Sequence, residues 1–158
     1  MRTILACATL VLAASTVAMG ALAESLSVDV FQIEIEDGWA HLTEPAPASD
    51  PNRGDSIRIH NPNGPGVLDI GSYASSGPVQ PEVLRNLTNL PLTIPLTLQR
   101  WGDFSGYQHD YVEGTSFLRQ WWLANDSVVI FVTYRCDVEM RELETDAIDA
   151  MVRSLSAG

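Results

Sequence analysis

Three polar residues in the middle of the chain could support chemistry. His109-Asp110 is a dipeptide that metal phosphohydrolases use, and Arg119 follows it. Those enzymes need further His and Asp residues on helices, whereas His109 and Asp110 lie in a predicted strand beside Tyr107 and Tyr111. We therefore assign no catalytic residue and no metal ligand. A small hydrolase-like enzyme with a site around His109, Asp110 and Arg119 remains an alternative hypothesis.

Covalent catalysis has even less support in this sequence. A nucleophilic Ser or Cys needs a base within reach, and the chain contains no Gly-x-Ser-x-Gly motif. Cys136 follows the apolar run 128–134 and has no His close to it in sequence, so we expect a buried, inert thiol at a strand end. No cofactor is assigned, and the absence of a catalytic set makes an enzyme the less favoured interpretation.

The remaining chemical signal is aromatic. Trp, Tyr and Arg are the residue types enriched at binding hot spots, and they are concentrated between residues 100 and 135. The candidate binding surface consists of Trp101, Tyr107, Tyr111, Arg119, Trp121 and Trp122. The alternative is that these aromatic side chains form the core of a sheet. Arg119 shares a predicted strand face with Trp121 and Ile130, so it must extend to solvent, pair with a carboxylate or contact a ligand.

Most of the elements that position these residues are predicted strands. Alternation places Phe31, Ile33 and Ile35 on the buried face of one strand, and Asp37-Gly38 predicts a turn into a returning strand over residues 39–43. Further strands are predicted over residues 56–60, 67–73 and 104–113.

The strongest predicted hairpin joins residues 116–124 to residues 127–135 through Asn125-Asp126. A two-residue turn at that position would place Trp121 opposite Ile130. Both faces of this hairpin carry large apolar side chains, and strands of that kind are normally covered on both sides. We therefore expect the hairpin in the middle of the sheet.

Two helices complete the predicted fold. The first begins at Pro81, which the first turn of a helix tolerates, and carries Val83, Leu84, Leu87 and Leu90 at helical spacing. The second is predicted over residues 138–155 with Asp137 as its N-cap. Its apolar stripe consists of Met140, Leu143, Ala147, Ile148, Met151 and Leu155. The whole pattern predicts an α+β fold: an antiparallel sheet of six or seven strands with helices packed on it.

The first residues predict export. Arg2 precedes an uncharged apolar run over residues 4–18, and small residues at Ala21 and Ala23 suit signal peptidase. We therefore expect residues 1–23 to be a signal peptide that is cut before Glu24, and residues 24–158 to be a single periplasmic or secreted domain. Only Cys136 then remains, so no intramolecular disulfide can form.

Charge restricts the partners of that domain. The chain has a net charge of −11, and removal of Arg2 leaves eight Arg against 20 Asp and Glu, a net charge of −12. Nucleic acids and anionic lipids are bound by neutralising their phosphates, so neither is an expected partner. No segment after the signal peptide is apolar enough for stable membrane insertion.

The order of elements resembles the PsbP/Mog-type fold, a group that includes small exported bacterial proteins. The resemblance rests on residues 31–39, a strand that leads through a turn to Trp39, and on residues 117–122 paired with 129–134 before a closing helix. It implies an antiparallel sheet between helices and a protein that binds or stabilises a partner. Members of this fold do unrelated work, so it implies no functional residue.

These observations favour an exported, periplasmic, non-enzymatic binding or protein-interaction module for an unknown protein or small-molecule partner. Besides the hydrolase-like enzyme, a second alternative is an accessory subunit of an envelope complex. An aromatic-rich sheet without a catalytic set is the reason for this preference.

Overall fold

The structure is a computed structural model that describes residues 23–158. The signal peptide predicted over residues 1–23 therefore lies outside the described residues, apart from Ala23. The strands are β1 (Glu24–Val28), β2 (Phe31–Ile35), β3 (Ala40–Glu44), β4 (Arg53–His60), β5 (Val67–Ala74), β6 (Gln99–Trp101), β7 (Phe104–Glu113), β8 (Ser116–Asn125), β9 (Val128–Asp137) and β10 (Ser156–Ala157). The helices are α1 (Pro81–Leu87), the short 3-10 helix η1 (Val138–Met140) and α2 (Thr145–Arg153).

The strands form two sheets. The large sheet has seven strands in the order β3-β4-β5-β9-β8-β7-β6, and every neighbouring pair is antiparallel. The small sheet has the order β1-β2-β10. The predicted α+β class and antiparallel sheet with packed helices are thus confirmed, whereas the small second sheet was not predicted.

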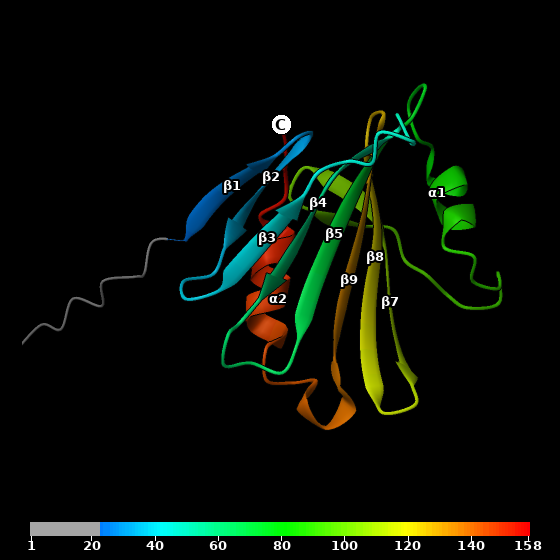
Figure 1. Cartoon of the computed structure of the whole chain (residues 1–158). Helices are drawn as coiled ribbons and strands as arrows, with labels where there is room; N and C mark the ends of the chain where they lie inside the picture. The colour runs from blue at the N-terminus through cyan, green and yellow to red at the C-terminus, as the bar shows by residue number, and fades with distance from the viewer. Residues whose placement is uncertain (1–22) are drawn as a thin grey trace, which may run out of the picture.

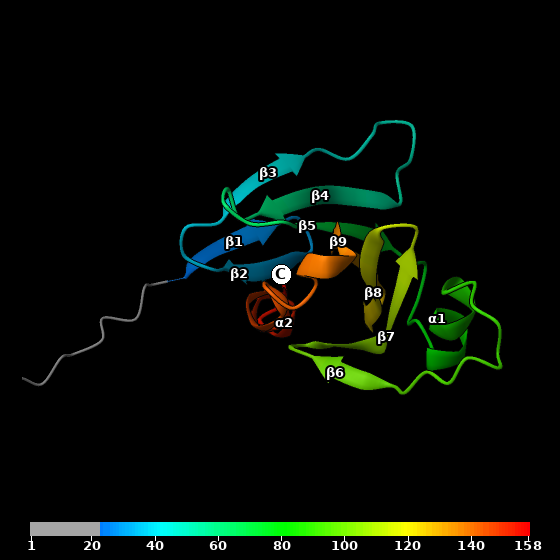
Figure 2. The same ribbon diagram turned by 90° about the horizontal axis from the view of Figure 1, so that it is seen from below.

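The two α-helices lie on opposite faces of the large sheet (Figures 1 and 2). On the inner face, α2 and β2 cover the main core, where Ile148 and Met151 pack with Phe31 and Trp121. On the outer face, α1 covers only the part over β7 and β8, where Leu84 forms the centre of a smaller apolar cluster. The rest of the outer face has no layer above it, and this uncovered part positions the candidate site.

The hairpin of β8 and β9 lies in the middle of the large sheet, as predicted. Its register differs from the prediction, because Asn125 pairs with Val128 and the turn is Asp126-Ser127. Asp126 adopts a left-handed backbone with φ of 49°, which Asp tolerates better than most residues. Trp121 consequently lies opposite Val132 and not Ile130. Each side chain of the hairpin still points to the face predicted for it, because the register changes by an even number of residues.

The N-terminal strands differ from the prediction in their pairing. Asp29 has a φ of 47° and turns the chain, so residues 24–28 form an additional strand that pairs with β2. Gly38 has a φ of 79° and lies in the predicted turn, but β3 pairs with β4 instead of returning to β2. The turn therefore carries the chain from the small sheet to the edge of the large one. Phe31, Ile33 and Ile35 point inward as predicted.

The helix predicted over residues 138–155 is divided into η1 and α2. The hydroxyl of Tyr134 donates a hydrogen bond of 2.8 Å to Oε2 of Glu144, and this glutamate is buried between the two helical segments. Because Glu144 points inward, Met140 and Leu143 are exposed rather than part of the predicted apolar stripe. Glu144, whose buried carboxylate accepts a hydrogen bond, thus occupies the inward position that amphipathic spacing predicted for Leu143.

Candidate functional site: a groove on the outer face of the sheet

The uncovered part of the outer face is hollowed along β5 and β9. Two hollows of about 230 and 630 Å³ lie there and share Arg58, Asp69 and Thr133 in their linings, so they form one continuous groove. We call this feature the outer groove, and define it by Arg53, Arg58, Asp69, Gly71, Thr133 and Arg135. The groove is open along its length and is not an enclosed cavity.

Strand alternation explains why these residues share one face. On β5, Leu68 and Ile70 are buried in the core, so Asp69 and Gly71 between them point outward. The register then places Asp69 between Arg58 on β4 and Thr133 on β9. Three polar side chains from three strands therefore meet across the middle of the groove.

Gly71 forms the floor of the groove. It pairs with Ser56 on β4 and with Phe131 on β9, and a Cβ added at this position would meet no atom within 4 Å. The space above the backbone is therefore open. Gly inside a strand often marks a close approach of a ligand or another backbone, and at this position the open space leaves room for such a group to lie on the sheet.

Mixed charge lines the groove. Arg58 holds Asp69 with two hydrogen bonds, 2.7 Å from Nε to Oδ1 and 3.3 Å from Nη2 to Oδ2, and this contact raises the pKa of Arg58. Both side chains are about half exposed, so the pair contributes little to stability and stays accessible. Within residues 23–158, Arg53 and Arg135 form no ion pair. The groove can therefore offer guanidinium donors to an acidic group and a carboxylate to a basic one.

Four of the six predicted binding residues are buried in two separate clusters. Trp101 and Trp121 are 2% and 1% exposed and pack in the main core on the inner face. Tyr107 and Trp122 are each 8% exposed and pack beneath α1 on the outer face. Trp121 and Trp122 are neighbours in one strand and so point to opposite faces. The structure thus does not combine these aromatic side chains into one open surface.

The three residues of the hydrolase-like alternative do not converge either. His109 lies on the outer face, where its ring stacks on Tyr111 with centroids 5.9 Å apart. Asp110 and Arg119 are paired on the inner face. The sheet therefore separates the only imidazole of this group from the carboxylate and the guanidinium.

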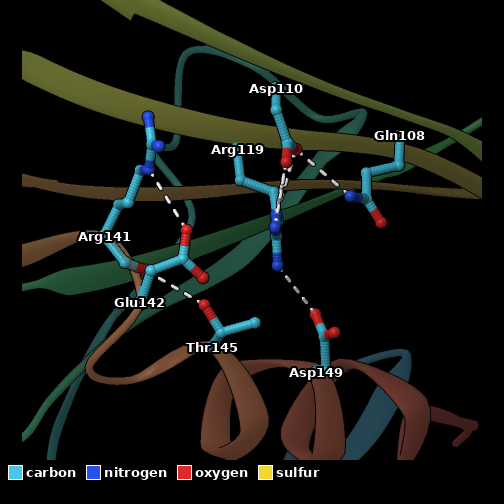
Figure 3. A network of polar contacts seen from close by, with 7 residues as sticks. All are labelled: Gln108, Asp110, Arg119, Arg141, Glu142, Thr145 and Asp149. Carbon is cyan, nitrogen blue, oxygen red and sulfur yellow. Dashed lines mark hydrogen bonds and ion pairs between the residues drawn. The ribbon is translucent and has the colours of Figure 1, made fainter. Parts of the chain in front are cut away.

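Arg119 instead joins α2 to the large sheet (Figure 3). Its Nε and Nη2 donate to the Asp110 carboxylate at 2.9 to 3.1 Å, and its Nη1 donates to Asp149 on α2 at 3.1 Å. Burial disfavours the charged guanidinium, but the contacts with the two carboxylates outweigh burial and raise the pKa of Arg119. Of the three possibilities predicted for this residue, pairing with carboxylates is the one observed.

The remaining candidate groups are the one cysteine and possible metal ligands. Cys136 is a buried free thiol, as predicted, and burial raises its pKa, which keeps it protonated and unreactive. Among residues 23–158, no three His, Cys, Asp or Glu side chains are grouped so that they could hold a metal ion. The helices of this part of the chain are all too short or too polar to cross a membrane.

Sequence reasoning did not find the outer groove. Its local signal was present, since Asp69 and Gly71 interrupt an apolar strand at positions that alternate with Leu68 and Ile70. What the local pattern could not show is that Arg58 and Thr133 flank Asp69. That placement depends on the register of three strands.

No protein-family model matches the chain, and no curated protein matches it. Solved structures do share its fold. A protein from Bacteroides thetaiotaomicron has a TM-score of 0.64 and 13% identity over 87% of this chain, which spans about half, 49%, of that protein. Cyanobacterial PsbP from Synechocystis sp. PCC 6803 has a TM-score of 0.58 and 10% identity, and covers 92% of this chain and 98% of its own length.

A third structure is LpqN, which is described as involved in cell envelope biogenesis of Mycobacterium tuberculosis. It has a TM-score of 0.49 and 16% identity over 88% of this chain and 87% of LpqN. The likeness to cyanobacterial PsbP shows that the chain has a PsbP-like fold, as the resemblance in the sequence predicted. Likeness at such low identity defines the fold alone, and function has to be argued from the site.

Proposed function

We propose that this protein is an exported, non-enzymatic interaction module that holds a segment of a partner protein in the outer groove. The observation that carries the proposal is the open strip over β4, β5 and β9, which has Gly71 as its floor and side chains of both charges along it. A partner segment with acidic and basic side chains would find complementary groups there.

The shape of the groove favours a polypeptide over a small molecule. Small-molecule sites usually bury most of their ligand in a concave pocket, whereas this groove is open along its length. On β5 the groove is lined from Val67 to Gly71, over about 13 Å, a length that suits roughly four or five residues of an extended peptide. An accessory subunit of an envelope complex is one setting in which such a module would work.

Export is part of the proposal and has its own test. A basic start, an apolar run and small residues before Glu24 support cleavage at that position. N-terminal sequencing of the protein recovered from the periplasm or medium should begin at Glu24. Recovery of the chain only from the cytoplasm with residues 1–23 intact would contradict export and would leave the groove hypothesis untouched.

The decisive variant is Gly71→Phe. The added ring would fill the floor of the groove beside Phe131, its cross-strand neighbour, without a clash at Cβ. Replacement of a strand glycine should leave thermal stability unchanged or raise it by about 0.5–1 kcal/mol. Val112→Phe adds a ring at an exposed position of β7, away from the groove, and is the matched control.

The assay is chemical cross-linking in native envelope extracts, followed by identification of the captured proteins and titration of the main one by calorimetry. We expect capture by the wild type and by Val112→Phe, and a dissociation constant at least about 30-fold weaker for Gly71→Phe, because the ring occupies the site of the partner segment. Equal capture by a fully folded Gly71→Phe protein would show that the groove is not the contact.

A further inference from the structure

Helix α1 and the loop after it project from one side of the large sheet (Figure 1). We call residues 79–98 the arm. The described residues include eight large apolar side chains that are strongly exposed, and half of them belong to the arm. They are Val83 at 52%, Leu87 at 47%, Leu92 at 81% and Leu98 at 48%. Of the four residues placed at helical spacing, Leu84 is buried against the sheet and Leu90 packs beside it, whereas Val83 and Leu87 are about half exposed.

Hydrogen bonds from one side chain connect the loop of the arm to α1. The guanidinium of Arg85 donates to the hydroxyl of Thr88 at 2.8 Å and to the carbonyl oxygens of Leu90, Pro91 and Ile94 at 3.0 to 3.2 Å. These four contacts close the loop onto α1. These contacts restrict the segment that carries the exposed leucines, which lowers the entropy lost when a partner binds.

A hollow of about 460 Å³ lies between α1 and the sheet. Val83 and Leu87 line it from the helix, while Tyr73, Val129 and Phe131 line it from β5 and β9. Tyr73 and Phe131 pack edge to face with ring centroids 5.4 Å apart. The arm thus combines protruding apolar side chains with an apolar recess.

Charge indicates which partner suits this surface. Between Asp69 and Arg100 the sequence contains only Glu82 and Arg85 as charged residues, and residues 86–99 contain none. Arg85 is directed at backbone carbonyls of its own loop. In a chain of net charge −11, this is the longest uncharged run of the described part. A basic partner would be attracted to the acidic surfaces elsewhere, whereas a second acidic copy can approach closely only where no charge opposes it.

We propose that the arm is an interface between two copies of this chain. In a two-fold symmetric dimer the same patch lies on both subunits, and apolar side chains of one arm, with Leu92 foremost, occupy the hollow of the other. The inference goes beyond the proposed function and does not depend on it: the hollow and the outer groove meet at Phe131, but Leu92 and Val83, the residues that test the dimer, line only the arm.

Sedimentation equilibrium of the exported protein tests the proposal over about 10 μM to 1 mM. We expect a dimer whose dissociation constant falls several-fold between about 0.05 and 0.5 M NaCl, since salt screens the repulsion between two acidic bodies. Leu92→Asp should weaken the dimer by at least about 100-fold, because each dimer contains the residue twice. Leu143→Asp is the matched control, since Leu143 is 70% exposed and lies outside the arm.

Several results would overturn the proposal. One is a monomer at every concentration and salt, and another is a dimer that salt weakens. A third is equal loss of the dimer in Leu92→Asp and Leu143→Asp. If Leu92→Asp still dimerises, the deciding variant is Val83→Asp, which changes the hollow. A dimer that persists in both variants would show that the contact lies elsewhere. Flotation of a monomer with phosphatidylcholine vesicles, abolished by Leu92→Asp, would assign the arm to a membrane surface instead.

Discussion

Replacement of Arg119 by Met removes the ionic connection between α2 and the large sheet while it keeps most of the aliphatic volume. The change deletes three hydrogen bonds to Asp110 and one to Asp149. It also removes a guanidinium that lies 5.7 Å from the ring centroid of Phe117 and 6.0 Å from that of Trp121. Folding should survive, because the apolar contacts of α2 with the core do not involve Arg119.

The expected loss in the free energy of unfolding follows from the exposure of the three charged side chains. The Arg119 side chain is 15% exposed, but its partners Asp110 and Asp149 are 35% and 39% exposed and can regain water. Breaking a fully buried pair costs about 3–5 kcal/mol, and losing a surface pair about 0.2–1 kcal/mol. An intermediate loss of about 2 kcal/mol is expected, which corresponds to a fall in Tm of about 7 °C for residues 24–158.

Urea denaturation of Arg119→Met, alone and with Asp110→Asn or Asp149→Asn, measures these contributions. The double-mutant cycle should give the larger coupling energy for Asp110, which accepts three of the four hydrogen bonds. A loss below about 0.5 kcal/mol for Arg119→Met, or a larger coupling to Asp149, would refute a structural role for the pair. Partner binding in the outer groove should be unchanged, because Arg119 faces the other side of the sheet.

Two further outcomes follow from the same contacts. Burial raises the pKa of Cys136 and of Tyr134, so the unfolded chain loses these protons at lower pH than the folded chain does. The free energy of unfolding should therefore fall above about pH 9. The fall should be about 1.4 kcal/mol per pH unit for each proton. Urea titrations across this range check it, and Tyr134→Phe should have a shallower slope. Arg85→Gln should loosen the arm, and the free energy needed to open the loop should fall by about 1–2 kcal/mol. Amide hydrogen exchange at Leu90 should then accelerate. Unchanged exchange would mean that Arg85 does not hold the loop.

The most accurate sequence predictions concern segments with a clear local pattern. Phe31, Ile33 and Ile35 face the core, residues 104–113 form a strand, and the hairpin around Asp126 is central in the sheet. Each of these depends on side-chain alternation or on apolar character on both faces of a strand, and both are properties of neighbouring residues.

The predictions that failed involve competition between local and distant contacts. Helical spacing favoured Leu143 as a core residue, but Tyr134 on β9 offers its hydroxyl to Glu144, and the helix is interrupted there. Likewise, the turn at Gly38 looked like a hairpin, yet β3 pairs with β4. Local propensity is a weak preference that tertiary contacts readily override.

The residues of the candidate site show the same difference between local patterns, which can be predicted, and distant contacts, which cannot. The sequence placed Trp121 and Trp122 on a candidate binding surface, with a sheet core as the alternative, and which of the two holds depends on which layers cover each face of the strand. Here α2 with β2 covers one face and α1 covers part of the other, so both side chains are buried. Only the uncovered remainder, with Gly71 as its floor, forms a groove.

The sequence by itself determined most strands of the large sheet and the acidic charge, and it predicts export and a single thiol after cleavage, because these follow from composition and from patterns a few residues long. Tertiary structure alone decided the strand register that places Arg58 beside Asp69, the separation of His109 from Asp110 and Arg119, and the exposure of the arm. These features depend on contacts between residues far apart in the chain. The free energy of such contacts is set by packing and pairing across the whole fold, which no local pattern records.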